Sequence, residues 1–593
     1  MSVQGETRIG DAGARGAWLR LWPWIAVLVL VRAWLALCAA DVYFYGEELA
    51  KGTCAKVILE RPPIPYWKAV YGYHEGGGFV VAHLKALGFA ILGESLLVHK
   101  VVGLLTASLV LSAGWMLARQ AFGARAAAIF GFLYALAPAA FVQFSLLTIG
   151  THFEALFFAA HILRLALKIV DEGGGTREDW LWLGLATGFG TYFSLQTLPV
   201  ALVAFLVLLV GLRRRFLSRE LAFGAAAFAV GILPLASMAL LAGELVWKVR
   251  GATYGKGSDG GPVGALLDLF GPLRVADHPI VLDVLVFAAQ ALLALACLVL
   301  LRRRRLAVLA LLGYVVLYLG LYATSGLAVG MGGLTFLWIR ICAPWLFTTI
   351  LAAAAIDASW DKRRGVAWTL LALYGAAGLQ DLARLTATGS PTTLVENTKV
   401  LATTRGVDYP QYFELFLPHF EVDKASKARI AMHLDDATRE LPAATAQVLW
   451  GKAELPTPVL LDEVRAAFGP RRWREALLGL GRALHPGEDY DLPHAFSAIS
   501  VAPADLQPLL AEAIGRSGIG PRFRVDRLQE LVDAPGIPEQ WREAWWRGCG
   551  WRVRMTFRLV PTRGRAWIAS QPEPMRAALL VGFERCDADL RLP

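Results

Sequence analysis

The sequence has few charged residues and few cysteines for its length. Only 18% of its 593 residues are charged, against about 25% in a typical soluble domain, and the mean hydropathy is +0.50. This composition excludes a purely water-soluble protein, and its long apolar stretches predict a polytopic membrane protein. The six cysteines lack the paired spacing of a zinc site. Cys38 with Cys54, and Cys549 with Cys586, could form disulfides in an oxidising compartment; free buried thiols are the alternative.

The net charge of +10 comes from basic residues in short loops between the apolar segments. We interpret them as topology signals and not as a nucleic-acid surface, so we expect no nucleic-acid partner. The N-terminal segment begins like a signal peptide, with arginines before an apolar run. That run is too long for a signal peptide, and Arg32 lies inside it. These features favour a retained signal-anchor helix.

Apolar windows of helix length, roughly 20 residues, predict an all-α protein with about eleven membrane-spanning helices. They lie near 18–39, 97–118, 126–143, 152–170, 180–194, 196–212, 220–242, 281–301, 306–325, 336–357 and 366–382. The segment 79–94 is also apolar but carries His83 and Lys85, so we expect a helix lying in the outer interface.

The basic loops test this topology. If the eleven spans alternate in direction, every basic cluster falls on one side of the membrane, as the positive-inside rule requires. The clusters are the N-terminal arginines, Arg119 with Arg125, and the runs at 213–215, 302–305 and 362–364. Merging the spans at 180–212 into one would move the later clusters to the wrong side. We therefore keep them as two.

This topology divides the chain into regions. We predict a cytoplasmic N-terminus over 1–17 and a transmembrane domain over 18–385, with an outer loop at 40–96. A linker over 386–430 and an α-helical domain over 431–593 then lie outside the cytoplasm. The expected location is the inner membrane of a bacterium, with the C-terminal domain in the periplasm.

The tail contains regularly spaced glycines. Gly481, Gly515, Gly548 and Gly582 are separated by 34, 33 and 34 residues. A period near 34 is typical of tetratricopeptide-type repeats, although their full signature is absent. Each glycine would close a helix or let two helices approach closely. We predict a repeat-like helical domain that binds a protein partner or packs on its own membrane domain.

Four motifs follow one another along the chain. The first apolar segment ends at Asp41, which begins an acidic cluster with Glu48 close behind. Carboxylates near lipid are costly and usually functional. A proline- and aromatic-rich loop comes next. The interfacial segment then ends in Ile-Leu-Gly-Glu-Ser at 91–95, and a late helix opens with Arg-Ile-Cys-Ala-Pro at 340–344.

Over roughly residues 18–360, these motifs resemble the GT-C superfamily of integral membrane glycosyltransferases. Protein O-mannosyltransferases and aminoarabinose transferases are examples. The family's Arg-Tyr-x-x-Pro segment has Ile341 in place of tyrosine here. The resemblance implies transfer of a sugar from a polyprenyl-phosphate donor to an acceptor (a protein, lipid or glycan) on the extracytoplasmic face of the lipid bilayer.

The resemblance also implies roles for charged residues. Sugar transfer needs a base for the acceptor, for which Asp41 is the candidate, with Glu48 beside it. It also needs cations that neutralise the departing phosphate. Arg340 is the candidate for that role, and Lys248 and Arg250 are further candidates. The alternatives are a solvated helix-end carboxylate for Asp41 and snorkelling to a lipid headgroup for Arg340.

The segment 150–154, Gly-Thr-His-Phe-Glu, opens the fourth predicted span from the outside. In some GT-C branches this loop supplies metal ligands. By resemblance, His152 and Glu154 are therefore candidates to hold Mg²⁺ or Mn²⁺ together with Asp41. For Glu154 we favour the alternative, a capping box with Thr151. For His152 the sequence favours neither reading.

Other features have plainer interpretations. His74 and Glu75 precede three glycines; acceptor binding is one hypothesis, but we favour a tight, mobile turn. His161 falls near mid-membrane, where we expect an interhelical hydrogen bond. The glycine-rich loop 254–261 fails the P-loop spacing, so we favour a linker over a lid.

Two other function classes stay open. A transporter or flippase would show repeat symmetry between its halves and charged residues within the spans, and no convincing repeat of that kind is visible. A non-catalytic scaffold would keep the GT-C-like body and bind partners through the tail. The imperfect Arg-Ile-x-x-Pro match leaves that hypothesis standing.

Overall fold

The protein is described by a computed structural model. It covers residues 11–39, 48, 51–52, 54–55, 58–59, 76–242, 274–275, 278–279, 281–324, 334–360, 363–388, 424, 428, 441–451, 455–484, 492–517, 529, 532–533, 536–557 and 561–590. Over these ranges the chain is helical apart from turns and a two-residue antiparallel pair, β1 (Arg274–Val275) with β2 (His278–Pro279). The prediction of an all-α protein is confirmed.

The chain divides into two compact units. Unit 1 contains Met1–Ala36, His74–Val81 and Lys100–Thr388, and unit 2 contains Leu37–Tyr73, Ala82–His99 and Gly389–Pro593. The helix α4 (Gly76–Leu92), which confirms the helix expected at 79–94, has residues in both. The predicted domain boundaries stay predictions.

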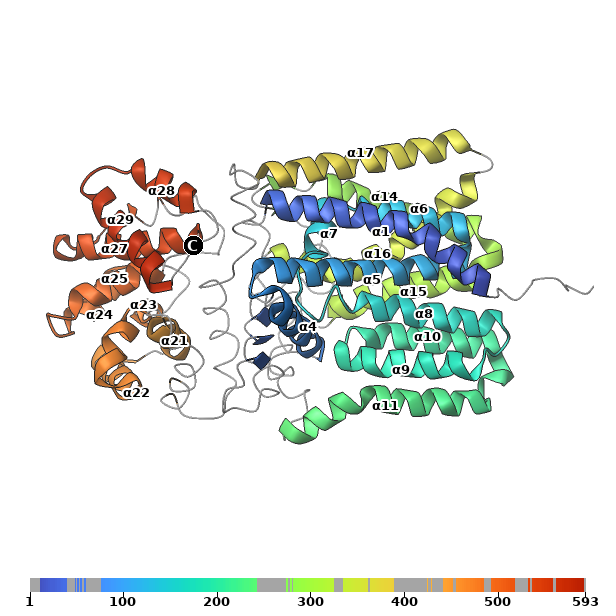
Figure 1. The fold of residues 1–593 in the computed structure, drawn as a ribbon, viewed down its shortest axis with the longest axis horizontal. Helices are drawn as coiled ribbons and strands as arrows, with labels where there is room; N and C mark the ends of the chain where they lie inside the picture. The colour runs from blue at the N-terminus through green and yellow to red at the C-terminus, as the bar shows by residue number, and fades with distance from the viewer. Residues whose placement is uncertain are drawn as a thin grey trace, which may run out of the picture. The chain divides into compact units, whose positions relative to one another are not determined.

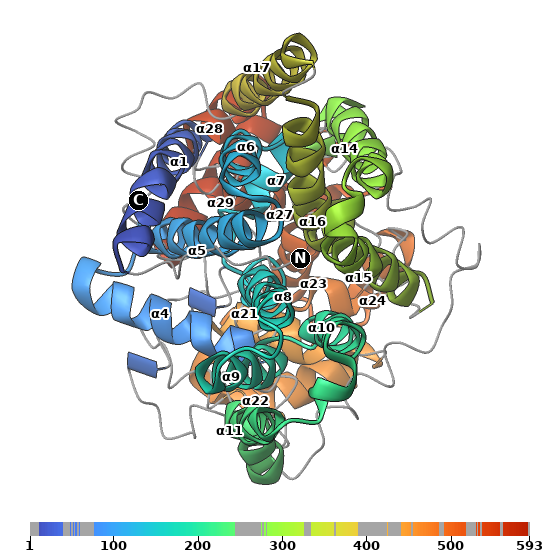
Figure 2. The ribbon, with the colours of Figure 1, turned by 90° about the vertical axis from the view of Figure 1, so that its right-hand side faces the viewer.

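Unit 1 is a bundle of long helices, seen from the side in Figure 1 and along the helix axes in Figure 2. The helices are α1 (Asp11–Ala39), α5 (Leu96–Phe122), α6 (Ala124–Ala135), α7 (Ala139–Phe144), α8 (Leu156–Asp171), α9 (Arg177–Phe193), α10 (Thr197–Leu212), α11 (Arg219–Ala242), α14 (Val281–Leu300), α15 (Arg305–Thr324), α16 (Leu334–Trp360) and α17 (Arg364–Thr388), with 3₁₀ turns η1 (Arg213–Phe216) and η2 (Arg302–Arg304).

Several of these helices suit a bilayer. Among the described residues, six helices are long and apolar enough to cross a membrane. Their apolar windows are Arg20–Leu37, Leu96–Phe122, Thr197–Phe216, Arg219–Ser237, Arg302–Leu321 and Cys342–Trp360. The prediction of a multi-pass membrane protein is confirmed, while the count of eleven crossings stays a prediction.

The division of 180–212 into two helices is confirmed. α9 ends at Phe193 and α10 begins at Thr197, with Ser194 in an extended conformation between them. Arg215 Nη1, just after α10, donates to the carbonyl oxygen of Gly173, just before α9, at 3.4 Å. The two helices therefore run in opposite directions, and the basic run at 213–215 lies beside the loop that precedes α9.

Other basic loops lie at the same end of unit 1. The Arg125 Nε, at the start of α6, pairs with Asp357 Oδ1 near the end of α16 at 2.6 Å. The Gln120 Nε2 donates to Asp171 Oδ2 at 3.0 Å, joining the ends of α5 and α8 (Figure 1). This clustering at one end is the arrangement that the positive-inside rule requires of a correct topology.

The predicted span 126–143 is wrong as a single helix. α6 ends at Ala135 and α7 begins only at Ala139. Pro138 explains the break, because it has no N–H to donate and disfavours helical geometry at Ala137 before it. The break leaves the last carbonyl groups of α6 without partners within their own helix.

Arg32 on α1 donates hydrogen bonds to the free carbonyl groups at the end of α6. Its Nη1 donates to the Ala135 carbonyl oxygen at 3.0 Å, and its Nη2 donates to that of Tyr134 at 3.4 Å. Its Nε donates to Ser145 Oγ at 2.8 Å. A cation at a helix C-terminus is favourable because the carbonyl oxygens carry partial negative charge. The fully buried arginine within α1 is thus explained by the helix end it caps.

The tail of unit 2 is a stack of shorter helices around a tryptophan-rich core. They are α21 (Leu441–Trp450), α22 (Thr457–Leu477), α23 (Gly481–Leu484), α24 (Leu492–Ser500), α25 (Gln507–Ser517), α27 (Glu539–Thr556), α28 (Pro561–Ala569) and α29 (Met575–Leu590).

The regularly spaced glycines lie where these helices touch. A Cβ atom added at any of the four would lie 1.8–2.5 Å from a backbone oxygen of a neighbouring helix. For Gly481, Gly515, Gly548 and Gly582 these oxygens belong to Ala513, Trp545, Glu512 and Arg547. The predicted close approach of helices is confirmed at every one of these glycines. A tetratricopeptide-like repeat stays a prediction.

Gly548→Ala should therefore destabilise the tail. The new methyl group would lie 2.1 Å from the Glu512 carbonyl oxygen, and overpacking of this kind costs roughly 1–3 kcal/mol. Thermal unfolding of the full chain, followed by tryptophan fluorescence, measures the loss. Gly365→Ala is the control, since nothing lies within 4 Å of its Cβ position. Equal stability of the two variants would contradict the close packing.

The described cysteines of the predicted disulfides are free. Cys54, Cys549 and Cys586 are all buried thiols, so the free-thiol alternative is confirmed for them and the bond between Cys549 and Cys586 is wrong. The side chain of Cys38 lies outside the described residues. Burial raises the pKa of Cys54 to about 12, although Lys51 and Lys85 act in the opposite direction.

Candidate functional site

Five of the nine candidate site residues fall outside what the structure describes. These are Asp41, His74, Glu75, Lys248 and Arg250. The backbone of Arg340 lies in the first part of α16. His152 and Glu154 are described in unit 1, and Glu48 in unit 2.

The glycines after Glu75 are packed and helical. Gly76, Gly77 and Gly78 form the first turn of α4, so the prediction of a mobile turn is wrong for them. A Cβ on Gly77 would lie 1.6 Å from the carbonyl oxygen of Gly150, and one on Gly76 would lie 2.3 Å from the Tyr192 ring. Gly150 itself has φ +97°, a conformation that favours glycine. Only glycines allow the start of α4 to lie this close to the loop 150–154.

The loop 150–154 precedes α8 and is not part of it. α8 begins at Leu156, and its N-cap, Ala155, makes no side-chain cap. The predicted capping box of Thr151 with Glu154 is therefore wrong. The buried Glu154 accepts the Gly150 N–H on Oε1 at 2.9 Å and so closes the loop on itself. The non-helical turn at 150–155 takes the carboxylate away from the helix end.

His152 lies in a hydrogen-bonded chain from three elements. Gln196 Nε2, in the turn between α9 and α10, is hydrogen-bonded to His152 Nδ1. Tyr318 Oη on α15 donates to Gln196 Oε1 at 3.4 Å. Gln196 thus fixes the orientation of the His152 ring.

The sequence patterns did not predict roles for Gln196 and Tyr318. The sequence does contain a signal for Gln196. It is a polar residue in the short turn between two apolar helices, which the positions of the basic loops predict to be separate. Tyr318 had none, since an aromatic residue on an apolar helix usually belongs to the core.

An aromatic chain connects this loop to α16. Phe153 packs on Phe141 of α7 with ring centroids 5.3 Å apart, and Phe141 packs on Trp345 at 3.6 Å. Trp345 follows Pro344 in the helix that carries Arg340. Three segments singled out by the sequence, 76–78, 150–154 and 340–345, are thereby joined in unit 1.

Glu48 lies in a separate cluster of buried charged groups in unit 2. Its backbone oxygen accepts a hydrogen bond from Lys85 Nζ at 2.7 Å, and Lys85 Nζ lies 2.9 Å from His99 Nδ1. Glu48, Lys85 and His99 are fully buried, and Lys51 nearly so. Lys85 is thus a buried cation that holds the segment at Glu48 on α4.

Metal binding stays a prediction. Among the described residues, no group of three or more His, Cys, Asp and Glu side chains could hold a metal ion. The third ligand inferred from the sequence, Asp41, lies outside them.

Residues 77–238 match the model of the dolichyl-phosphate-mannose-protein mannosyltransferase family. This segment is of the GT-C glycosyltransferase type. It includes α4, the loop 150–154 and Gln196, and it excludes Asp41 and Arg340. The resemblance to GT-C glycosyltransferases drawn from other motifs is confirmed.

Solved structures similar to this chain include forms of an oligosaccharyltransferase from Archaeoglobus fulgidus. The apo form is 15% identical, with a TM-score of 0.39; the match covers 68% of this chain and 60% of that chain. The form with an inhibitory peptide and a dolichol-phosphate is 13% identical, with a TM-score of 0.41 and coverages of 81% and 72%. Scores at this level do not establish a common fold. No curated protein matches the sequence.

Proposed function

We propose that the protein transfers a sugar from a polyprenyl-phosphate donor to an acceptor at the extracytoplasmic face of a bacterial inner membrane. The observation that supports this proposal is the close contact of Gly77 with Gly150, which we call the junction. It lies inside the segment that matches a mannosyltransferase family. The basic loops at the opposite end support a cytoplasmic N-terminus and a periplasmic tail. The tail is then available to a protein partner.

The proposed reaction is a single displacement. Asp41 takes the proton of the acceptor hydroxyl, with Glu48 nearby in sequence. The acceptor oxygen bonds to the anomeric carbon of the sugar as the bond to the phosphate oxygen breaks. Polyprenyl phosphate leaves, and Arg340 neutralises it, assisted by Lys248 and Arg250.

Residues around the junction would complete the site. His152, oriented by Gln196, lies in the loop that packs on the start of α4, where His74 and Glu75 precede the glycines as candidate acceptor ligands. A divalent ion, Mg²⁺ or Mn²⁺, held by His152 and Glu154 with Asp41, would supply further positive charge at the phosphate.

Lipid mass spectrometry on protein purified in mild detergent tests the donor class. The wild type should co-purify with a polyprenyl phosphate or its sugar adduct, and Arg340→Ala should lose it, because one charge-assisted contact changes affinity by about tenfold or more. Bulk phospholipid alone in both samples would instead favour the scaffold or the transporter.

Asp41→Asn should reduce transfer from that donor by about 10²–10⁴-fold, the usual contribution of a general base. The melting temperature should not change, because the substitution keeps the shape of the side chain. Glu47→Gln is the matched control, since it removes a carboxylate from the same loop and should keep most activity. Full transfer by Asp41→Asn would remove the residue from the mechanism.

A further inference from the structure

One face of α8 carries three polar side chains and a phenylalanine within a predicted membrane span. Phe157, His161, Arg164 and Lys168 are half-buried and lie three or four residues apart, so they share a face of the helix. Most of the other α8 residues are buried. The sequence predicted a satisfied interhelical hydrogen bond for His161 and did not single out Arg164.

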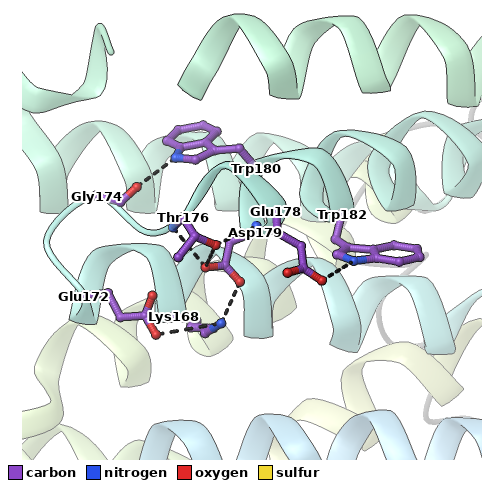
Figure 3. A network of polar contacts seen from close by, with 8 residues as sticks. All are labelled: Lys168, Glu172, Gly174, Thr176, Glu178, Asp179, Trp180 and Trp182. Carbon is purple, nitrogen blue, oxygen red and sulfur yellow. Dashed lines mark hydrogen bonds and ion pairs between the residues drawn. The ribbon is translucent and has the colours of Figure 1, made fainter. Parts of the chain in front are cut away.

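The acidic groups at the end of this row are already engaged. Lys168 Nζ pairs with Asp179 Oδ1 at 2.6 Å and with Glu172 Oε1 at 3.7 Å (Figure 3). The other oxygen of Asp179 accepts hydrogen bonds from Thr176, from N at 3.1 Å and from Oγ1 at 2.8 Å. Figure 3 shows this closed network at the start of α9. These contacts engage both oxygens of Asp179 and one oxygen of Glu172.

Arg164 and His161, deeper on the same face, each have one buried nitrogen without a hydrogen bond to any described residue. Within the described part of the chain, the buried Nε of Arg164 and the buried Nδ1 of His161 have no hydrogen-bond partner. The expectation of a satisfied His161 is therefore wrong for Nδ1. Its ring stacks on Phe157 at 5.9 Å and 7°. Unpaired cationic and polar groups at membrane depth are costly, so such groups normally have a ligand or partner.

The depth of Arg164 indicates the kind of ligand. It lies seven residues before Asp171, or about 10 Å along the axis at 1.5 Å per residue. Asp179, at the end with the basic loops, is the acid that acts electrostatically on its guanidinium. An arginine side chain can reach toward a bilayer surface from this depth. The oxyanion available in that leaflet is a lipid phosphate, and the basic loops attract anionic lipids there.

We propose that the face of α8 at His161 and Arg164 binds the phosphate of an anionic phospholipid in the leaflet on the basic-loop side. The guanidinium offers paired N–H donors that fit phosphate oxygens, and the imidazole adds a third donor beside it. This lipid is bound in the leaflet opposite the proposed transfer site and is not its substrate. The inference does not depend on the proposed function.

Native mass spectrometry of the full chain in mild detergent with added phosphatidylglycerol tests the proposal. The wild type should keep a phospholipid adduct that Arg164→Gln loses by about tenfold or more. Arg177→Gln is the matched control, because Arg177 is exposed at the same end and packs on the Phe223 ring. It should keep the adduct. Arg164→Lys, which keeps the charge without the paired donors, should retain part of it and provides a second variant if Arg164→Gln does not fold.

Three outcomes overturn the proposal. Equal adducts in the wild type and Arg164→Gln would show that the arginine does not hold the lipid. Equal losses in Arg164→Gln and Arg177→Gln would show only a general attraction of anionic lipid to a basic surface. A co-purifying membrane protein lost from Arg164→Gln, with lipid unchanged, would indicate that a carboxylate from a partner helix occupies the site instead.

Discussion

Gly77→Ala is expected to reduce sugar transfer by about 10²-fold or more. The new Cβ would lie 1.6 Å from the Gly150 carbonyl oxygen and 2.8 Å from the Phe193 ring. The first contact is with backbone, so the start of α4 and the loop 150–154 must move apart. A displacement near 1 Å at a site of this kind costs about two orders of magnitude in rate. Initial rates with the donor found by lipid mass spectrometry measure the effect.

The stability change separates this effect from unfolding. Overpacking at one position costs roughly 1–3 kcal/mol, which a membrane bundle of this size should withstand, so the variant should still purify as a folded protein. Gly313→Ala is the control: it changes a helical glycine of unit 1 with nothing within 4 Å of its Cβ position. If both variants kept wild-type rates, the junction of α4 with the loop would have no part in transfer.

Arg32→Leu is expected to destabilise unit 1 by roughly 3 kcal/mol. Two carbonyl oxygens at the end of α6 and the Ser145 hydroxyl would lose their donor, and each unsatisfied buried acceptor costs about 1–3 kcal/mol. The loss of a costly buried charge offsets part of this sum. The melting temperature in detergent should fall by several degrees.

Two variants test that interpretation. Arg20→Leu removes an exposed arginine from the same helix and should change little. Arg32→Lys keeps the charge but has a single ammonium group in place of the planar guanidinium, so it should give intermediate stability. A melting temperature of Arg32→Leu equal to that of the wild type would show that the α6 end needs no cap from α1.

Much of the fold could be predicted from local patterns. Apolar length located the helices, and the alternation of basic loops correctly separated α9 from α10. The break between α6 and α7 also has a signal in the sequence, because Pro138 lies inside the apolar run that predicts a single helix over 126–143. The spacing of glycines in the tail correctly predicted helices in close contact.

The site was harder to predict because its contacts join distant parts of the chain. His152 and Glu154 were found from their residue types, but the predicted capping box failed, since the helix starts at Leu156, four residues later than a cap at Thr151 requires. The bond to Gln196 joins positions 44 residues apart, and no periodic pattern indicates such a pair. Arg164 was not predicted for another reason. The sequence does not show whether a charged residue on a helix face has an ion-pair partner.

The hydrogen bonds from Arg32 to the end of α6 have a consequence for membrane insertion. The arginine and Ser145 are 113 residues apart in the chain. At synthesis rates of about 5–20 residues per second, Arg32 would leave the ribosome roughly 6–23 s before Ser145 is made. During that interval its guanidinium has none of the acceptors that bury it later. We therefore expect α1 to be held at the translocon or at the membrane surface, and to settle only when α6 and α7 arrive.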